Sequence, residues 1–189
     1  MSPRPPYPIQ PFPKVKDYVA YAGIGSKETP DNICHLMRGI ARMLYDRGYV
    51  LRSGGAPGAD EAFEQGTPVM ATMEIFLPWN RFNGKPDLLH LTPTELGVAR
   101  SIAEKYHPNW LACSEGAKKL HTRNTMQILG RDCATPSKFV VCWTSNGKAI
   151  GGTGQALRIA EDKKIKIYNL HDPGTRILFY QELGWEHDL

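Results

Sequence analysis

The sequence contains few cysteines, and none of them is spaced as in a metal-binding or redox motif. Its 189 residues include four, Cys34, Cys113, Cys133 and Cys142, which lie far apart and form no CxxC pair. Structural zinc sites and disulfide frameworks rely on such close spacing. The histidines and acids lack compact ligand spacing too. We therefore expect buried thiols in a reducing compartment, no metal site, no disulfide framework and no cofactor.

Long hydrophobic runs are also missing. The first eleven residues hold five prolines and no continuous apolar stretch, which argues against a secretory signal or a membrane-spanning helix. We predict a Pro-rich arm over residues 1–16, either mobile or lying across a neighbouring subunit, and one domain over residues 17–189. The expected location is the cytoplasm, and no membrane partner is expected.

The charge is only mildly unbalanced. Lys and Arg total 23 against 19 Asp and Glu, a formal net charge of +4, and no dense basic run occurs. This balance weakly favours anionic ligands. Proteins that bind single-stranded DNA use a groove rich in Lys, Arg and aromatic residues. The sequence shows no such concentration of these residues. A nucleic acid partner is thus possible but disfavoured.

Two common nucleotide-binding motifs are absent. Lys27 follows a GIGS turn and Lys148 precedes a glycine cluster, so neither lysine completes the GxxxxGK[ST] order of a phosphate-binding loop. The first glycine turn does not match GxGxxG either. ATP hydrolysis and dinucleotide-dependent redox chemistry are therefore disfavoured.

Short apolar runs alternate with helical patterns along the chain. A first helix should begin near Thr29 and Pro30 and end at Gly48. The remaining pattern predicts strands over 18–22, 49–51, 73–77, 138–143 and 165–168, and helices over 59–65, 94–105, 121–131, from residue 156 onward, and over 176–183. This order predicts an α/β fold: a single Rossmann-like domain with a mostly parallel sheet and helices on both faces.

Glycine-rich turns follow several of these strands, and parallel strands bring such turns to one edge of the sheet. Residues 53–60 and 151–155 each place glycines directly before a helix, where backbone N–H groups and the helix dipole favour an anion. Either Trp79 or Phe82 could stack on a base, and Arg81 could pair with phosphate. The other ligand-binding candidates in these turns are Gly23, Gly25, Ser26, Ser53, Gly54, Gly55, Gly58, Asp60, Thr144, Gly151, Gly152, Thr153 and Gly154.

Four segments carry a resemblance to a known superfamily: YAGIGSKETP, LRSGGAPGADEAFE, LHTRN and GGTGQALRIAEDKKIKIYNL. Together they resemble the SLOG superfamily of Rossmann-like domains over about residues 18–170. Its members include the DNA-processing protein A domain and the lonely-guy phosphoribohydrolases. The chain is most similar to small stand-alone DNA-processing-A-like proteins, including phage-encoded ones. The resemblance implies glycine loops that hold nucleotides or their derivatives, and a homo-oligomer.

The resemblance also bears on catalysis. Arg123 matches the arginine of the MHxRK-like stretch of lonely-guy enzymes, with Asn124 in the lysine position. The glutamate that follows the second glycine turn in those enzymes has no counterpart, because Leu157 or Arg158 stands there. A replacement acid could come from Asp60, Glu61 or Glu64.

Three functions therefore remain open. The leading one is binding of a phosphate-bearing, nucleotide-derived small molecule in a glycine-lined cleft, to sequester, sense or carry it, with Arg123 on the phosphate and Asn124 on a ribose or base. The alternative is a hydrolase that cleaves an N-glycosidic or phosphate-containing bond. The second alternative is binding of single-stranded DNA as in DNA-processing A proteins. Whether the protein is an enzyme stays undecided at this point.

Overall fold

A computed structural model describes residues 18–184. The predicted arm over residues 1–16 lies outside the described residues. Five strands form one sheet in the order β3-β2-β1-β4-β5, and every neighbouring pair is parallel. The strands are β1 (Val19–Gly25), β2 (Tyr49–Ser53), β3 (Met73–Ile75), β4 (Phe139–Trp143) and β5 (Lys166–Asn169).

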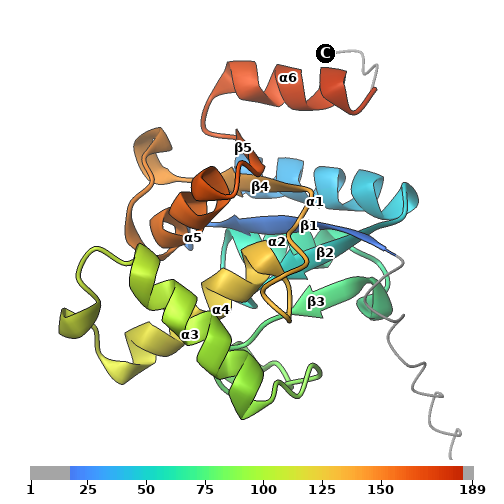
Figure 1. Cartoon of the computed structure of the whole chain (residues 1–189). Helices are drawn as coiled ribbons and strands as arrows, with labels where there is room; N and C mark the ends of the chain where they lie inside the picture. The colour runs from blue at the N-terminus through green and yellow to red at the C-terminus, as the bar shows by residue number, and fades with distance from the viewer. Residues whose placement is uncertain (1–17, 185–189) are drawn as a thin grey trace, which may run out of the picture.

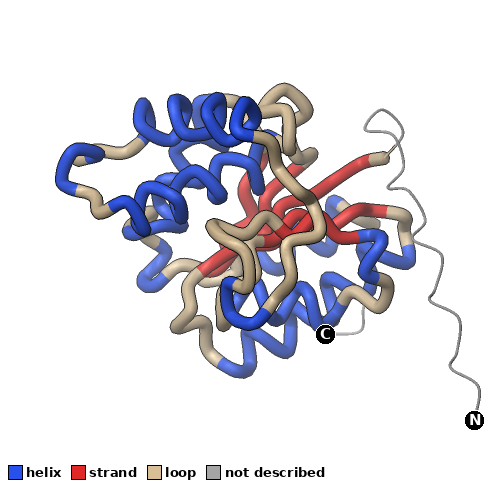
Figure 2. The backbone as a smooth tube through the Cα atoms, turned by 90° about the horizontal axis from the view of Figure 1, so that it is seen from below, coloured by secondary structure: helices blue, strands red, loops and turns tan. Residues whose placement is uncertain are grey.

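Six α-helices cover the two faces of this sheet. They are α1 (Asp31–Asp46), α2 (Ala59–Gly66), α3 (Pro93–Tyr106), α4 (Glu115–Leu129), α5 (Gly151–Asp162) and α6 (Pro173–Glu182). Residues of α1, α2 and α6 belong to one core cluster, and residues of α4 and α5, with α3 packed against them, belong to another. The strands lie between these two layers (Figures 1 and 2). The predicted α/β Rossmann-like fold is confirmed.

Strand β1 shows how the sequence supplies both cores. Side chains of a strand point alternately to the two faces of the sheet. Tyr21 accordingly packs in the cluster of α1 and α2, whereas Ala22 and Ile24 pack in the cluster of α4 and α5. A strand buried on both faces reads as a nearly continuous apolar run, as this one does.

Three helices begin earlier than the sequence pattern indicates, and one of them is α6, which starts at Pro173 and not at residue 176. Helix α4 starts at Glu115 and not near residue 121, because the Ser114 hydroxyl caps it by accepting the N–H of Ala117 at 3.2 Å. Helix α5 starts at Gly151, so the second glycine cluster is the first turn of a helix and not a loop before it.

The chain reverses its direction across the sheet at β1. From β1 it proceeds outward through β2 to β3, and then crosses to β4 on the other side of β1. Such a switch point leaves a crevice beyond the carboxyl ends of the two central strands, where ligands bind in open α/β sheets. Gly25 of β1 is in register with Trp143 of β4 at this point. No helix within residues 18–184 is both long and apolar enough to span a bilayer.

Candidate functional site

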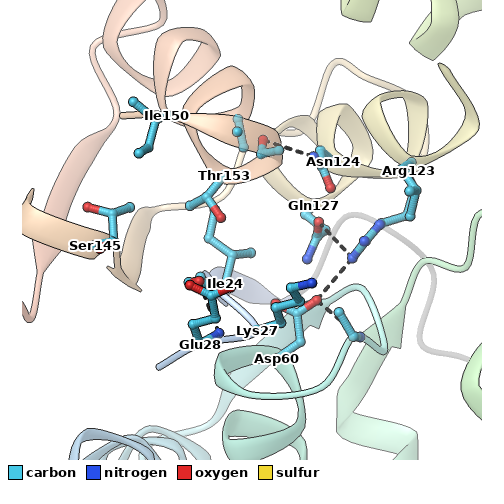
Figure 3. A pocket seen from close by; sticks show the side chains of 18 residues that line it. Ile24, Lys27, Glu28, Asp60, Arg123, Asn124, Gln127, Ser145, Ile150 and Thr153 are labelled. Carbon is cyan, nitrogen blue, oxygen red and sulfur yellow. Dashed lines mark hydrogen bonds and ion pairs between the residues drawn. The ribbon is translucent and has the colours of Figure 1, made fainter. Parts of the chain in front are cut away.

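A cavity of about 420 Å³ lies at this switch point. Its walls come from the end of β1, the start of α2, the middle of α4, and the segment that joins β4 to α5 (Figure 3). We call it the switch-point cavity. Its volume falls within the range that small-molecule sites occupy. The lining residues are Ile24, Gly25, Ser26, Lys27, Glu28, Ala56, Asp60, Leu120, Arg123, Asn124, Gln127, Thr144, Ser145, Ile150, Gly151, Gly152, Thr153 and Ala156.

The N-terminus of α5 opens into the switch-point cavity. Its first three residues, Gly151, Gly152 and Thr153, all line the wall. The N–H groups of a first helical turn have no acceptor within the helix, and no side chain caps this end. The Asn124 side chain fixes the turn by donating its Nδ2–H to the carbonyl of Gly152 at 3.0 Å. Three backbone N–H groups and the positive end of the helix dipole thus converge on this wall.

A buried ion pair forms the opposite wall. Nη1 of Arg123 lies 2.9 Å from Oδ2 of Asp60, and both side chains are more than nine-tenths buried. Burial raises the pKa of the Asp60 carboxyl to about 6, although the guanidinium of Arg123 acts in the opposite direction. The site therefore holds an acid that ionises near neutral pH.

Two buried donors at this wall have no partner. Nε of Arg123 and Nε2 of Gln127 make no hydrogen bond to any described residue. Gln127 is one helical turn beyond Arg123 and accepts from Nη1 of that residue at 3.4 Å. A buried donor left unsatisfied costs about 1–3 kcal/mol. Oxygen atoms of a bound anion would remove this cost.

The first of the two anion-binding turns, residues 53–60, is occupied by the protein's own side chains. Oε1 of Glu64 accepts the hydroxyl of Ser53 at 2.7 Å and the N–H of Gly55 at 3.0 Å. Lys85 pairs with the other oxygen of Glu64. The N–H of Ala56 is directed at Asp60, 3.4 Å away. This turn therefore supplies the cavity with an acid and not with a row of free N–H groups.

Several glycines of the predicted site provide room for protein atoms. An added Cβ at Gly54 would lie 1.4 Å from Nη1 of Arg123, so this glycine accommodates the guanidinium. At Gly58 an added Cβ would lie 2.6 Å from the carbonyl oxygen of Ser26. By contrast, Gly151 has no heavy atom within 4 Å of such a position, and its φ of +63° lies in the left-handed region that glycine favours.

The predicted site residues therefore separate into two groups. The structure brings together at the cavity Gly25, Ser26, Asp60, Arg123, Asn124, Thr144, Gly151, Gly152 and Thr153. Outside its lining lie Gly23, Ser53, Gly54, Gly55, Gly58, Trp79, Arg81, Gly154, and two of the candidate acids, Glu61 and Glu64. Glu61 is exposed and accepts from Gln65 at 3.3 Å. Asp60 is the one candidate acid that lines the cavity.

The loop after β3 places its two candidate aromatic residues in different surroundings. Trp79 remains 44% exposed and packs edge-on against Phe82. It is the ring of Phe82 that reaches the site, with its centroid 5.8 Å from Cζ of Arg123. The loop therefore covers the buried arginine from outside the cavity.

Sequence reasoning missed four polar residues of the lining, Lys27, Glu28, Gln127 and Ser145. The signal for Gln127 was its spacing of four from Arg123, which places both side chains on one face of a helix. The signal for Lys27 was its position directly after the turn that follows β1. The lining also includes an acid, Glu28, at the exposed rim.

Comparisons with known proteins identify no family for this chain. No family model matches the sequence, and no curated protein matches it. One solved structure is similar, at 14% sequence identity and a TM-score of 0.40, over 88% of this chain and 83% of the other. Its title describes single-stranded DNA binding by DNA processing protein A from Helicobacter pylori. A similarity of this size concerns the arrangement of the fold alone, and membership of the SLOG superfamily stays a prediction.

Proposed function

We propose that the protein binds a phosphate-bearing, nucleotide-derived small molecule in the switch-point cavity, to sequester, sense or carry it. The phosphate group would lie at the N-terminus of α5. The observation that carries this proposal is the meeting of the uncapped first turn of α5 with the unpartnered buried donors of Arg123 and Gln127 around one cavity.

The chemistry of the cavity favours an anion with an attached organic group. Helix N-termini bind phosphate through backbone N–H groups, and a guanidinium adds a charge-assisted hydrogen bond. Lys27 adds a positive charge at the exposed side, partly balanced by Glu28. Ile24, Ile150 and Ala156 supply an apolar part of the lining, suited to the flat face of a base.

Thr153 offers a sharp test of this arrangement. Its side chain extends into the cavity from the first turn of α5 (Figure 3). In T153D, a carboxylate would occupy the proposed phosphate position while still stabilising the helix N-terminus. T153N is the matched neutral control. Calorimetry with nucleoside monophosphates, nucleoside diphosphates and cyclic nucleotides should show affinity reduced about tenfold or more in T153D and by less than about threefold in T153N.

Two results would count against this function. One is the absence of binding by the wild-type chain across the whole panel. The other is equal affinity in T153D and T153N, which would place the phosphate elsewhere. An oligonucleotide of single-stranded DNA belongs in the same panel. Binding confined to that probe, weakening steeply as salt rises, would favour the DNA-binding alternative.

A second candidate function rests on Asp60. A buried carboxyl whose pKa is about 6 can exchange a proton at neutral pH, as cleavage of an N-glycosidic bond requires. Hydrolysis of the bound nucleotide is therefore the alternative at the same site, with Arg123 orienting the phosphate. Chromatography of nucleotides incubated with wild-type protein should reveal a released base in that case. Loss of release in D60N with retained binding would support it, and unchanged nucleotides would exclude it for those substrates.

A further inference from the structure

We propose that His107, Cys113 and His121 form a site for one Zn²⁺ ion. The three residues come from the end of α3, the segment between α3 and α4, and the middle of α4. One ligand atom from each lies within 4.8 Å of the others. This site is separate from the switch-point cavity and does not depend on the proposed function.

The distances within the group suit a tetrahedral metal. Sγ of Cys113 lies 3.6 Å from Nε2 and 3.7 Å from Nδ1 of His107. Zinc–sulfur and zinc–nitrogen bonds meeting at a tetrahedral angle separate the two ligand atoms by about 3.6 Å. The rings of His107 and His121 are also close, with centroids 4.3 Å apart. The three ligand groups are therefore close enough for one ion to lie among them once the rings turn toward it.

An unsatisfied atom at the same place points to a ligand. Nδ1 of His121 is buried and makes no hydrogen bond of ordinary geometry, although the side chain of Gln155 lies near enough to interact with this imidazole. Nδ1 of His107 accepts the backbone N–H of Asn109 at 3.2 Å and also lies 3.7 Å from Sγ of Cys113, and a metal at this atom would replace both contacts.

The ligand set and its surroundings select the class of metal. One thiolate with two imidazoles suits zinc, whereas oxygen ligands would be needed for Mg²⁺ or Ca²⁺. Buried Trp110 packs against both histidine rings, with centroids 6.1 Å and 6.4 Å away, and shields one side of the group. Three protein ligands leave a fourth position for water or an exchangeable ligand.

The site would connect the segment after α3 to the helix that carries the cavity. His121 precedes Arg123 by two residues, and His107 and Cys113 belong to the preceding connection. A bound ion would therefore fix the position of α4 beside the switch-point cavity. The sequence expectation of no metal site overlooked this group because its spacings match no short motif and become close only after α3 and α4 pack together.

Cobalt titration tests the site directly, because Co²⁺ replaces Zn²⁺ and reports thiolate ligation by absorption. After metal removal with a chelator, the full-length protein should take up one equivalent of Co²⁺. Thiolate-to-cobalt charge transfer and tetrahedral d–d bands should appear, and Zn²⁺ should abolish both. C113S should lose the charge-transfer band, and H107N should weaken binding. C133S, at the other half-buried cysteine, should behave as wild type.

A second measurement uses only the wild-type chain, in case a variant fails to fold. Zn²⁺ should protect Cys113 from alkylation by iodoacetamide, as read by peptide mass spectrometry, and leave the reactivity of Cys133 unchanged. Failure of Co²⁺ to give a charge-transfer band in wild type, or equal alkylation of Cys113 with and without Zn²⁺, would overturn the proposal. A cobalt spectrum retained in C113S would also overturn it.

Discussion

The guanidinium of Arg123 occupies the space that a side chain at Gly54 would fill. An added Cβ at Gly54 would lie 1.4 Å from Nη1, 2.5 Å from Cζ and 2.8 Å from Cδ of this arginine. The arginine cannot simply move aside, because Nη1 is held by Asp60 at 2.9 Å and Phe82 covers the group. The buried ion pair can therefore form only because residue 54 has no side chain.

Gly54→Ala should therefore destabilise the protein by breaking the pair. We expect the free energy of unfolding to fall by about 2–3 kcal/mol, since overpacking and a disrupted buried ion pair combine. Denaturant unfolding followed by circular dichroism measures it. G152A is the matched control, because its added Cβ would meet only Nδ2 of Asn124, at 3.4 Å. Similar losses in the two variants would contradict this packing role of Gly54.

Removing the arginine should have an effect that depends on pH. Asp60 has a folded-state pKa raised to about 6, so the stability linked to its protonation is complete below the unfolded pKa of about 4 and is lost as pH rises through 6. Without Arg123 the charged form is still less favourable. R123Q should cost about 3 kcal/mol of unfolding free energy near pH 8 and clearly less near pH 5. Denaturant unfolding at the two pH values measures this, and a loss independent of pH would contradict it.

Ligand affinity should follow the same titration. When Asp60 ionises, its carboxylate competes with the ligand for Arg123 and adds negative charge to the cavity. A phosphodiester such as a cyclic nucleotide keeps its own charge throughout this range. We therefore expect its affinity to decrease by several-fold as pH rises through about 6. Calorimetry across this range tests it, and D60N should show no such step.

Glu95 should stabilise the start of α3 through its charge. It forms a capping box with Thr92 and pairs with Arg131, which lowers the pKa of the Glu95 carboxyl to about 2. A depressed pKa contributes stability that is present above the unfolded pKa of about 4.3 and is lost as pH falls toward 2. E95Q keeps an acceptor for the cap but loses the charge, and should cost about 1 kcal/mol at neutral pH.

The pH dependence provides the control for this prediction. The difference in unfolding free energy between wild type and E95Q should shrink as pH falls below about 4.3 and through 2, because protonation of Glu95 leaves both side chains neutral. E95A, which lacks the cap acceptor too, should retain a further loss of about 1 kcal/mol at low pH. A constant difference between wild type and E95Q would show that the charge of Glu95 is not the stabilising feature.

Local patterns were sufficient to predict the sheet. Strands such as Phe139–Trp143 are apolar runs bounded by polar turns, and their order along the chain predicts parallel pairing. The site was predicted only in part. That Gly151 faces open space while Gly54 accommodates Arg123 depends on contacts between distant segments. The presence of a glycine in the sequence does not tell which of these two roles it has.

The acids illustrate the same limit. Asp60, Glu61 and Glu64 are near neighbours on one short helix, and the sequence offered all three as candidates. Helix geometry directs them to different surroundings: Asp60 to the cavity, Glu61 to solvent, and Glu64 to the turn at Ser53. Their roles were decided by Arg123 and Lys85, which lie far away in the sequence.

The pairing of β1 with β4 has a consequence for how the protein folds. Ala22 and Val140 are partners in the sheet although more than a hundred residues separate them. Such non-local pairing forms slowly, because the entropy of closing a long loop is lost before the stabilising contacts between the strands form. The switch-point cavity has walls on both sides of this junction. The proposed nucleotide binding should therefore appear late in refolding, together with the last protected amides of β4. A chain released from the ribosome before Phe139 should have no affinity for the ligand.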